Sequence, residues 1–255
     1  MRFNLISPAI VLRTRPFGES DKIVSFFTRD HGKLTGIAKG ALRSRRRFVN
    51  SLESFSLVNL TFQDRSQRNL AFLISADLIH GPKGLMTDLD RLAHASYLVE
   101  ITEGLIGERE ENPAVFQHLK EGLDHLEENG TSLRFLTFFE LKLLRLAGYQ
   151  PVLDNCKKCH KDCLDESPSQ WHFSPLEGGI LCDSCSRSCR EVLPLGRTAV
   201  EILTALQADN GSLPARLSLP ASVVSEIRSA VLRFIQFHME REIKSASFLH
   251  PFSSV

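Results

Sequence analysis

Two C-x-x-C motifs constrain this chain more than any other feature. They are Cys156-Lys-Lys-Cys159 and Cys182-Asp-Ser-Cys185, and 22 residues separate the inner cysteines. Two residues between thiolates allow one tight turn to present both sulfurs to a single ion, and two such turns complete the tetrahedron that Zn²⁺ prefers. The intervening segment is slightly longer than the usual span of about 15–20 residues. The pattern predicts a structural zinc ion bound by Cys156, Cys159, Cys182 and Cys185.

Other ligand sets and other cysteine chemistry stay open. Cys163 and Cys189 each follow a C-x-x-C pair by four residues, so either could replace a ligand, as could His160 or His172. A redox dithiol would need a βαβ context, whereas the flanking segments here have helical periodicity. Four protein ligands leave a zinc ion no open position for water or substrate, so the expected site is structural rather than catalytic.

The bulk composition is that of a globular protein. The 255 residues are 42% hydrophobic and 24% charged, which allows two or three small domains or one large one. The sequence has no apolar run of 18 residues, so no membrane span is expected. The N-terminus lacks the apolar stretch of a secretory signal. We therefore expect a cytoplasmic protein with reduced cysteines.

Charge is distributed unevenly along the chain. Residues 1–80 carry 13 Lys and Arg against 6 Asp and Glu, whereas residues 81–150 carry 7 against 12 and residues 151–255 carry 11 against 12. The net charge of +1 for the whole chain conceals this asymmetry. A basic N-terminal third on a nearly neutral chain indicates a module that binds a polyanion.

The first 80 residues have the pattern of short β-strands. Five runs rich in β-branched and aromatic residues are separated by turn residues, and they span residues 8–15, 21–28, 33–39, 54–62 and 70–75. Five strands of this length joined by short turns suit a small antiparallel barrel. An OB-fold is the leading candidate, although periodicity alone does not distinguish it from an SH3-like barrel.

Helical periodicity replaces this pattern from about residue 88. Asp88 is a predicted N-cap, Pro113 begins a second helix that ends near Asn129-Gly130, and Thr131 or Ser132 begins a third. Two more helices are expected over residues 196–208 and from Pro220 to about Lys244. The prediction is a multidomain α+β protein. An OB-fold occupies residues 1–80, and an α-helical domain over residues 81–255 contains a zinc-binding insertion at about 152–192.

The loop after the third predicted strand is strongly basic. Five cationic side chains fall within the nine residues from Lys39 to Arg47, beside Gly40. Arginine matches phosphate oxygens geometrically, and each phosphate contact releases counterions. The predicted nucleic-acid-binding residues are Arg13, Lys22, Arg29, Lys33, Lys39, Arg43, Arg45, Arg46 and Arg47. Phe17, Phe48 and Phe55 could stack on unpaired bases, but each could equally belong to the barrel core, and the loop could be merely a solvated surface.

No catalytic motif accompanies these features. The sequence lacks G-x-x-x-x-G-K-[ST], H-E-x-x-H and G-x-S-x-G. We therefore expect a binding protein and not an enzyme. Two alternatives remain, a zinc-dependent nuclease and a zinc-ribbon factor of transcription or translation. In the second, Lys157, Lys158 and Lys161 beside the cysteines would contact nucleic acid.

In their order along the chain, these motifs resemble the RecO family of bacterial recombination mediators. The matching stretches are Ala38-Lys-Gly-Ala41 with its arginines, the segment 139–151 that ends in Ala147-Gly-Tyr-Gln-Pro151, and the cysteine pairs with Phe173 and Gly178-Gly179 between them. The likeness covers nearly the whole chain. Ala147 stands where the family has leucine, and Cys163 and Cys189 are additional cysteines.

The resemblance implies more than the residues do alone. It implies an N-terminal OB-fold, a helical domain and an inserted zinc-binding segment. It also implies binding to single- and double-stranded DNA and annealing of complementary strands. The implied partners are RecR, the C-terminal tail of the single-stranded DNA-binding protein SSB and, indirectly, the RecA recombinase, which the family helps to load onto SSB-coated DNA. The DNA role is thereby extended to Lys39 and the arginines that follow it.

Overall fold

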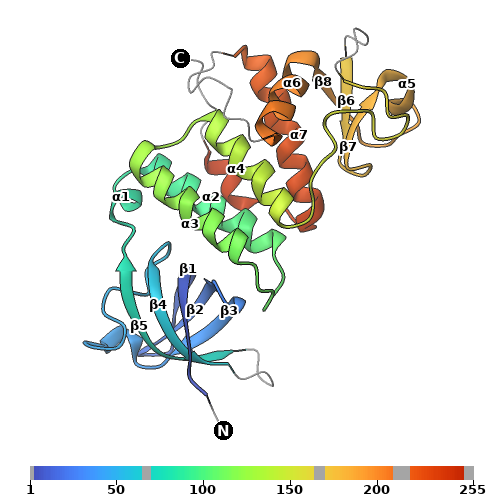
Figure 1. Cartoon of the computed structure of the whole chain (residues 1–255). Coiled ribbons are helices and arrows are strands. Elements are labelled where there is room, and N and C mark those ends of the chain that lie inside the picture. The colour runs from blue at the N-terminus through green and yellow to red at the C-terminus, as the bar shows by residue number, and fades with distance from the viewer. Residues whose placement is uncertain (1–2, 65–69, 164–169, 209–218, 250–255) are drawn as a thin grey trace. The chain divides into compact units, whose positions relative to one another are not determined.

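The computed structural model describes residues 3–64, 70–163, 170–208 and 219–249 (Figure 1). Its internal contacts divide the chain into two compact units, Met1–Gly130 and Thr131–Val255. The first three helices therefore share a unit with the β-strands. The division expected from periodicity lies earlier, after residue 80, because periodicity reports where the element type changes and not which elements pack together.

Five strands of the first unit form a closed barrel. They are β1 (Leu5–Phe17), β2 (Asp21–Thr28), β3 (Gly32–Ala38), β4 (Leu57–Gln63) and β5 (Ala71–His80). Their order is β1-β2-β3-β5-β4, and every neighbouring pair is antiparallel except β3 and β5. This topology confirms the predicted OB-fold. Alternate residues of each strand point inward, and the rings of Phe26 and Phe62 meet edge to face at 5.7 Å in the core.

The connection from β3 to β4 is anchored to this core. It begins with Gly40 in the left-handed region (φ 69°) and a short 3₁₀ helix, η1 (Ala41–Arg43). Further along, Phe48 and Leu52 are buried in the barrel core. The backbone N–H of Ala76 on β5 donates to the carbonyl of Arg47 (2.8 Å). The predicted basic loop is thus held at both ends.

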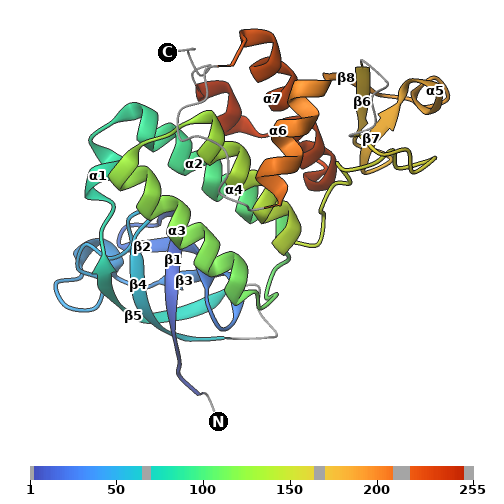
Figure 2. The same ribbon diagram turned by 45° about the horizontal axis from the view of Figure 1, so that its top comes forward.

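Three helices complete the first unit: α1 (Lys83–Met86), α2 (Leu89–Leu105) and α3 (Pro113–Asn129). The Asp88 side chain caps α2 by accepting from the backbone N–H groups of Asp90 and Arg91, as predicted from its residue type. Gly130 ends α3 with φ 73°. Figure 2 shows α3 lying across the strands, where the rings of Phe27 and Phe116 are 5.8 Å apart.

The second unit is built on three helices, α4 (Leu133–Leu146), α6 (Arg197–Gln207) and α7 (Ala221–Met239), followed by the 3₁₀ helix η2 (Lys244–Phe248). Both α6 and α7 pack against α4. The carboxylate of Glu140, which is fully buried on α4, accepts from Arg228 on α7 at 2.5 Å. This pair ties two helices together inside an otherwise apolar core.

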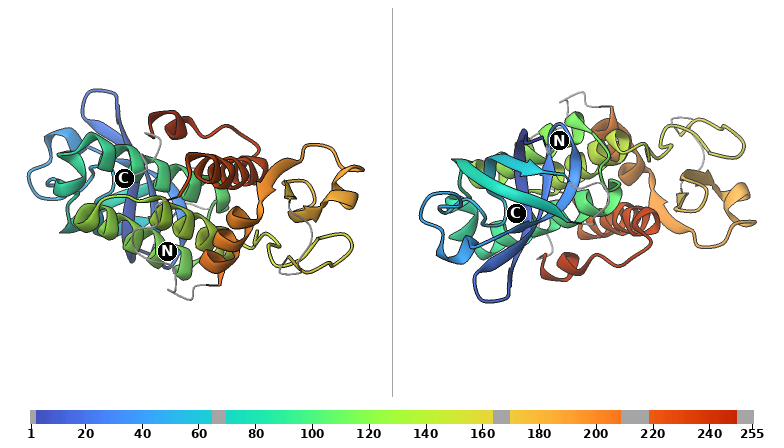
Figure 3. Two further views of the ribbon diagram at one scale, coloured as in Figure 1. Left: turned by 90° about the horizontal axis from the view of Figure 1, so that it is seen from above. Right: turned by 90° about the horizontal axis from the view of Figure 1, so that it is seen from below.

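The cysteine segment contains a small sheet that the sequence did not predict. Its strands are β6 (Gln170–Ser174), β7 (Gly179–Cys182) and β8 (Leu193–Gly196), in the order β7-β6-β8, and a single turn of helix, α5 (Asp183–Ser186), follows β7. In both views of Figure 3 the sheet and α5 extend outward from α6 and α7. Residues 164–169 of the predicted insertion lie outside the described residues.

In the part of the chain that the structure describes, no helix has both the length and the apolar character needed to cross a bilayer.

Candidate functional site

The four predicted cysteines lie together in the second unit. The sulfurs of Cys156, Cys159, Cys182 and Cys185 are all within 4.8 Å of one another, and those of Cys159 and Cys182 are 3.6 Å apart. A tetrahedron with Zn–S bonds of about 2.3 Å places its sulfurs about 3.8 Å apart. The residues present therefore fit a tetrahedral metal ion.

Backbone hydrogen bonds shape the first cysteine turn. The N–H of Cys156 donates to the carbonyl of Lys161 (2.8 Å), and the N–H of His160 donates back to the carbonyl of Cys156 (2.8 Å). His160 adopts φ 59°, which closes the turn. The N–H of Lys157 donates to Ile180 on β7 (2.9 Å), so the turn is fixed beside the strand that ends in the second cysteine pair.

A close backbone approach brings this segment to the sheet. Val152 lies opposite Gly179 in a parallel bridge. The N–H of Val152 donates to the carbonyl of Gly178 (3.0 Å), and the carbonyl of Val152 accepts from the N–H of Ile180 (2.9 Å). A Cβ atom at Gly179 would collide with the carbonyl oxygen of Val152. Glycine is therefore required there, and the Gly178-Gly179 pair has a physical reason beyond forming a turn.

The sulfurs share negative charge unevenly. Burial opposes ionisation of Cys182, but the Ser184 hydroxyl and the Cys185 backbone N–H lower the pKa of this thiol to about 6. The neighbouring Cys182 sulfur, with burial, raises the pKa of Cys185 to about 12. Four adjacent thiolates repel one another, and a divalent cation at their centre would remove that repulsion.

The additional cysteines and histidines lie outside this cluster. The Cys163 N–H donates to Asp154 (3.0 Å), and burial raises the pKa of its thiol. The Cys189 sulfur lies 3.7 Å from a carboxylate oxygen of Glu177. His172 Nδ1 is 3.6 Å from Asp183, and the ring belongs to β6 rather than to the cysteine cluster. Among the described residues, the sulfurs close enough to share one ion are those of the two C-x-x-C pairs.

The basic loop forms a second candidate site at one end of the barrel. Lys39, Arg43, Arg45, Arg46 and Arg47 are all exposed. Arg47 is the most constrained of them, because its guanidinium donates to the carbonyl of Lys39 (2.7 Å) and lies 5.2 Å from the ring of Phe48. The loop thus presents a cluster of cations on a fixed backbone.

Asp21 organises this end of the barrel, although no local signal in the sequence predicted it. Its carboxylate accepts from the backbone N–H of Gly40 (2.8 Å), which lowers its pKa, and lies 4.0 Å from the ammonium of Lys39. Next to it, the carbonyl of Ser20 accepts from the N–H of Leu42 (2.9 Å). The β1–β2 turn therefore holds the start of the basic loop.

The remaining predicted cations do not all lie near the basic loop. Lys22 pairs with Ala38 in the register of β2 and β3 and so lies at the same barrel end as the loop, where it meets Glu53 at 3.3 Å. Arg29 follows the last residue of β2, about 23 Å from Lys22 at about 3.3 Å per residue, and is in an ion pair with Asp30.

Lys33, the second residue of β3, is only 9% exposed. Its ammonium donates to the carbonyls of Glu103 (2.7 Å) and Ile106 (3.0 Å) and lies 3.5 Å from Glu108. Arg13 pairs with the Glu103 carboxylate at 2.8 Å. These contacts occupy the donors of Lys33 and join the barrel to the end of α2, which indicates a structural role.

The three phenylalanines considered for base stacking also differ. Phe48 and Phe55 are buried, Phe48 in the barrel core and Phe55 with φ 70° beside β4. Phe17, at the end of β1, is 50% exposed. Only this ring is presented to solvent among the three.

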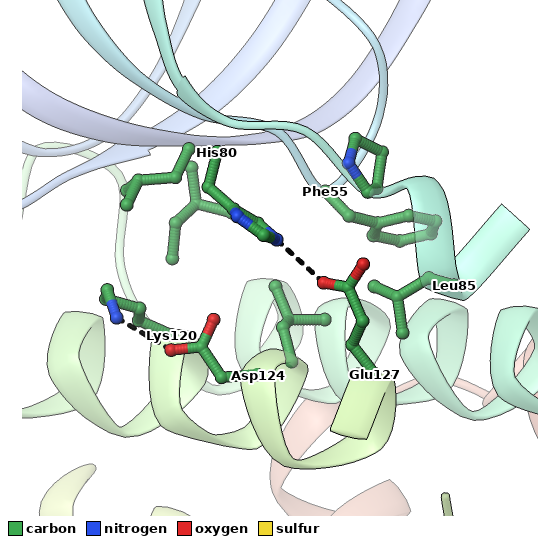
Figure 4. A pocket seen from close by; sticks show the side chains of 10 residues that line it. Phe55, His80, Leu85, Lys120, Asp124 and Glu127 are labelled. Atoms are coloured by element: carbon green, nitrogen blue, oxygen red, sulfur yellow. Dashed lines mark hydrogen bonds and ion pairs between the residues drawn. The ribbon is translucent and has the colours of Figure 1, made fainter. Parts of the chain in front are cut away.

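A shallow pocket lies between the barrel and α3 (Figure 4). Its floor is apolar and includes Phe55 and Leu85. At its rim, His80 Nε2 meets a carboxylate oxygen of Glu127 at 2.7 Å, and the other oxygen accepts from the backbone N–H of Gly84 (2.7 Å). Glu127 on α3 thus binds His80 on β5 and the Gly84 backbone on the other side of the pocket. Because these polar groups satisfy one another, the pocket is a packing contact rather than an open binding site.

Comparisons with known proteins cover almost the entire chain. A family model described as recombination protein O N terminal matches residues 1–82, and one described as recombination protein O C terminal matches residues 86–247. A DNA repair protein RecO from Caldanaerobacter subterraneus subsp. tengcongensis is 33% identical over 97% of this chain and 98% of its own. Proteins of the same name from Syntrophus aciditrophicus and Anaeromyxobacter sp. (strain K) are each 35% identical, over 94% of this chain and 92% and 93% of their own.

Proposed function

The chain belongs to the RecO family of recombination and DNA repair proteins, and from this premise we propose that it is a recombination mediator that binds single- and double-stranded DNA through the basic end of its barrel. In this role it anneals complementary strands. With RecR, it helps to load RecA onto single-stranded DNA coated by SSB, whose C-terminal tail it contacts. The site of action is the cytoplasm.

The observation that carries the DNA proposal is the cluster of exposed cations on an anchored loop. Lys39, Arg43, Arg45 and Arg46 are exposed at the barrel end where Asp21 and Phe48 fix the backbone. A fixed array of cations can neutralise the phosphates of two strands at once and lower their mutual repulsion. Complementary bases can then pair without any bond being made or broken by the protein.

We infer for the same reason that the protein is not an enzyme. Annealing and loading require binding energy but no nucleophile, general base or open metal position. The rival function is a metal-dependent nuclease. Incubation of end-labelled single strands with the protein and Mg²⁺ tests it directly, and we expect the strands to remain intact. Cleavage that is lost in a matched binding-defective variant would favour the nuclease instead.

We propose zinc as the ion of the cysteine cluster, in a structural role. Four sulfurs at tetrahedral spacing suit Zn²⁺, and the donor set would be closed by Cys156, Cys159, Cys182 and Cys185. Zinc binding would join the turn at residues 156–159 to the end of β7 and thereby fix the small sheet. Metal analysis of the purified chain should give about one zinc per molecule, and about none after Cys182→Ser.

The decisive test of function is annealing of complementary oligonucleotides coated with SSB. We expect the protein to accelerate pairing, and RecR to alter the rate of subsequent RecA assembly. The matched control is a variant with Arg43, Arg45, Arg46 and Arg47 replaced by alanine, which should anneal slowly although it folds normally. Equal annealing by this variant and the wild type would remove the basic loop from the proposal.

A zinc-ribbon factor of transcription or translation is the second candidate. It requires Lys157, Lys158 and Lys161 to contact nucleic acid, but Lys158 lies 3.2 Å from the Glu177 carboxylate, which reduces the free positive charge there. Replacing Lys157 and Lys161 by alanine in the full chain should leave DNA affinity within about twofold. A loss as large as that of the arginine variant would favour this candidate.

A further inference from the structure

Phe17 is an exposed aromatic residue at the end of a barrel strand. It is the last residue of β1, it stands opposite Asp21 in the register of β1 and β2, and it is 50% exposed. Half of this side chain is left in water, whereas Phe48 is buried in the barrel core. An exposed phenylalanine alone is unremarkable, so its neighbours decide whether it has a role.

Those neighbours belong to the basic loop. Asp21, the register partner of Phe17, binds the backbone N–H of Gly40 at 2.8 Å and lies 4.0 Å from the Lys39 ammonium. The carbonyl of Ser20, in the turn that follows Phe17, accepts from the N–H of Leu42. Phe17 therefore stands beside the first residues of the loop, through contacts that the barrel itself fixes.

A further cation lies beside the ring on its own strand. Arg15 and Phe17 are two residues apart on β1, so they share one face of the strand, and both are exposed. Lys22, which stands opposite Pro16 in the register of β1 and β2, lies on the other face of the strands and pairs with Glu53.

The acids near the ring are Glu19, exposed in the turn, and Asp21, which is engaged by Gly40 and Lys39. Leu42 adds one exposed apolar side chain at the start of the loop. The exposed surface around the ring is therefore charged for the most part, with Arg15 and Lys39 as its cations.

We propose that Phe17 stacks on an unpaired base of single-stranded DNA while the surrounding cations bind the neighbouring phosphates. This inference rests on the proposed function, and it adds how the barrel distinguishes single strands from duplex. Phosphates are available in both forms, but the flat face of a base is available to a side chain only when the base is not covered by its neighbours in a duplex. The cations supply affinity for either form, and the ring supplies preference for the single strand.

The charge around Phe17 favours this occupant over a protein partner. A protein-docking residue of this size is usually part of a contiguous apolar patch with a polar rim. Here the exposed cations are Arg15, on the same strand face as the ring, and Lys39, beside its register partner Asp21, and such cations match the regularly spaced anions of a nucleic-acid strand. Single-strand binding sites combine a basic groove with aromatic faces in this way.

The first test measures affinity of the full chain for an oligo-dT strand and for a duplex of equal length. Phe17→Ala should weaken single-strand binding by about 5- to 150-fold, the range expected for loss of one base–aromatic stack, and change duplex binding by less than about twofold. Phe17→Tyr should retain the affinity, whereas Phe17→Leu, which keeps apolar area but no ring, should lose it. Phe237→Ala is the matched control, because Phe237 on α7 is 42% exposed and far along the chain from the loop.

A second test reports contact directly. The chain has one tryptophan, Trp171, which is 1% exposed and contributes a constant background. In Phe17→Trp, oligo-dT should quench the new fluorescence, and the duplex should not. No quenching at saturating oligo-dT, or equal quenching by both probes, would overturn the proposal.

Different results would exclude the stacking role of Phe17 and the proposed DNA-binding function. If Phe17→Ala binds oligo-dT like the wild type while the arginine variant does not, the stacking role is wrong and the proposed function stands. If neither variant changes affinity for either probe, the barrel end is not the DNA site, and both are wrong. Equal loss on single strand and duplex would assign Phe17 to the shape of the loop instead of to base contact.

Discussion

The cysteine cluster and the basic loop are the two chemically distinctive regions of this chain, and they are built in opposite ways. The cluster directs its sulfurs toward one another, and local backbone hydrogen bonds close its turns. The loop leaves its cations exposed, although Arg47 also binds the Lys39 carbonyl, on a backbone fixed by Asp21 and Phe48. Groups that satisfy one another stabilise a fold, whereas groups left facing solvent on a fixed support are free to bind a partner.

Two lysines close together in the sequence show the same contrast between groups bound within the protein and groups facing solvent. Lys33 at the start of β3 is 9% exposed and binds backbone carbonyls near the end of α2. Lys39, just after the strand ends, is exposed. Residue type predicts a positive charge at both positions, but only burial and contacts decide whether that charge serves folding or binding.

The largest expected effect is on the cysteine cluster. Cys182→Ser removes one of four ligands, and structural zinc contributes about 10–16 kcal/mol in zinc-finger peptides. We expect the variant to lose more than about 3 kcal/mol of unfolding free energy in the second unit, measured by denaturant unfolding, with DNA affinity per folded molecule nearly unchanged. Cys189→Ser is the matched control and should unfold like the wild type. Lost DNA binding in a Cys182→Ser protein that melts like the wild type would reverse the assignment.

A second prediction concerns the buried ion pair of the helices. Glu140→Ala removes a fully buried carboxylate from Arg228, whose side chain is 13% exposed, and breaking such a pair costs about 3–5 kcal/mol. The exposed pair of Arg197 and Glu201 on α6 is the comparison, and Glu201→Ala should cost less than about 1 kcal/mol. Thermal unfolding measures both. Similar losses in the two variants would show that burial does not control the strength of these pairs.

The two lysines give a third prediction. Lys33→Ala should lower the unfolding free energy by about 1–3 kcal/mol, because the carbonyls of Glu103 and Ile106 lose their donor, and should leave DNA affinity per folded molecule unchanged. Lys39→Ala should weaken DNA binding with no measurable loss of stability. Unfolding curves and binding isotherms on both variants check the pair. If Lys33→Ala lost DNA affinity without losing stability, and Lys39→Ala lost stability without losing DNA affinity, the assignment of structural and binding lysines would be wrong.

The smallest prediction is the pH dependence of metal binding. The pKa of Cys185 near 12 means that this thiol carries a proton at neutral pH when no cation is present. Cys182, with a pKa of about 6, is already ionised there. Zinc must displace the Cys185 proton, so affinity should rise about tenfold, or about 1.4 kcal/mol, per pH unit between 7 and 8 for each proton released. Competition with a chelator measures this slope, and a flat profile would contradict it.

Local signals predicted much of the fold. Asp88, Ser132 and Gly130 mark helix ends through contacts within a few residues, and the structure has the helices at those bounds. The strands of the small sheet were not predicted, because elements as short as the four residues of β7 have too few positions for a period to be recognised.

The cysteine cluster was predictable and the limits of the basic surface were not. Spacing within the chain brings Cys156 and Cys159 to one ion, so the sequence contains that information directly. Lys33 is buried by residues 70 and 73 positions away. Phe17 ends a strand half exposed, whereas Phe48 lies in the β3–β4 connection and packs into the core. Burial by residues far away in the sequence produces no local sequence pattern, so it could not be predicted.

The central claim is that DNA meets the basic end of the barrel while the cysteine cluster only supports the fold. The most direct test is the slope of log K against log salt concentration for oligo-dT binding, measured on the wild type, the four-arginine variant and Cys182→Ser. We expect the arginine variant to flatten the slope by about 1–3, and Cys182→Ser, corrected for its folded fraction, to keep the wild-type slope. An unchanged slope in the arginine variant together with a flattened one in Cys182→Ser would contradict the account.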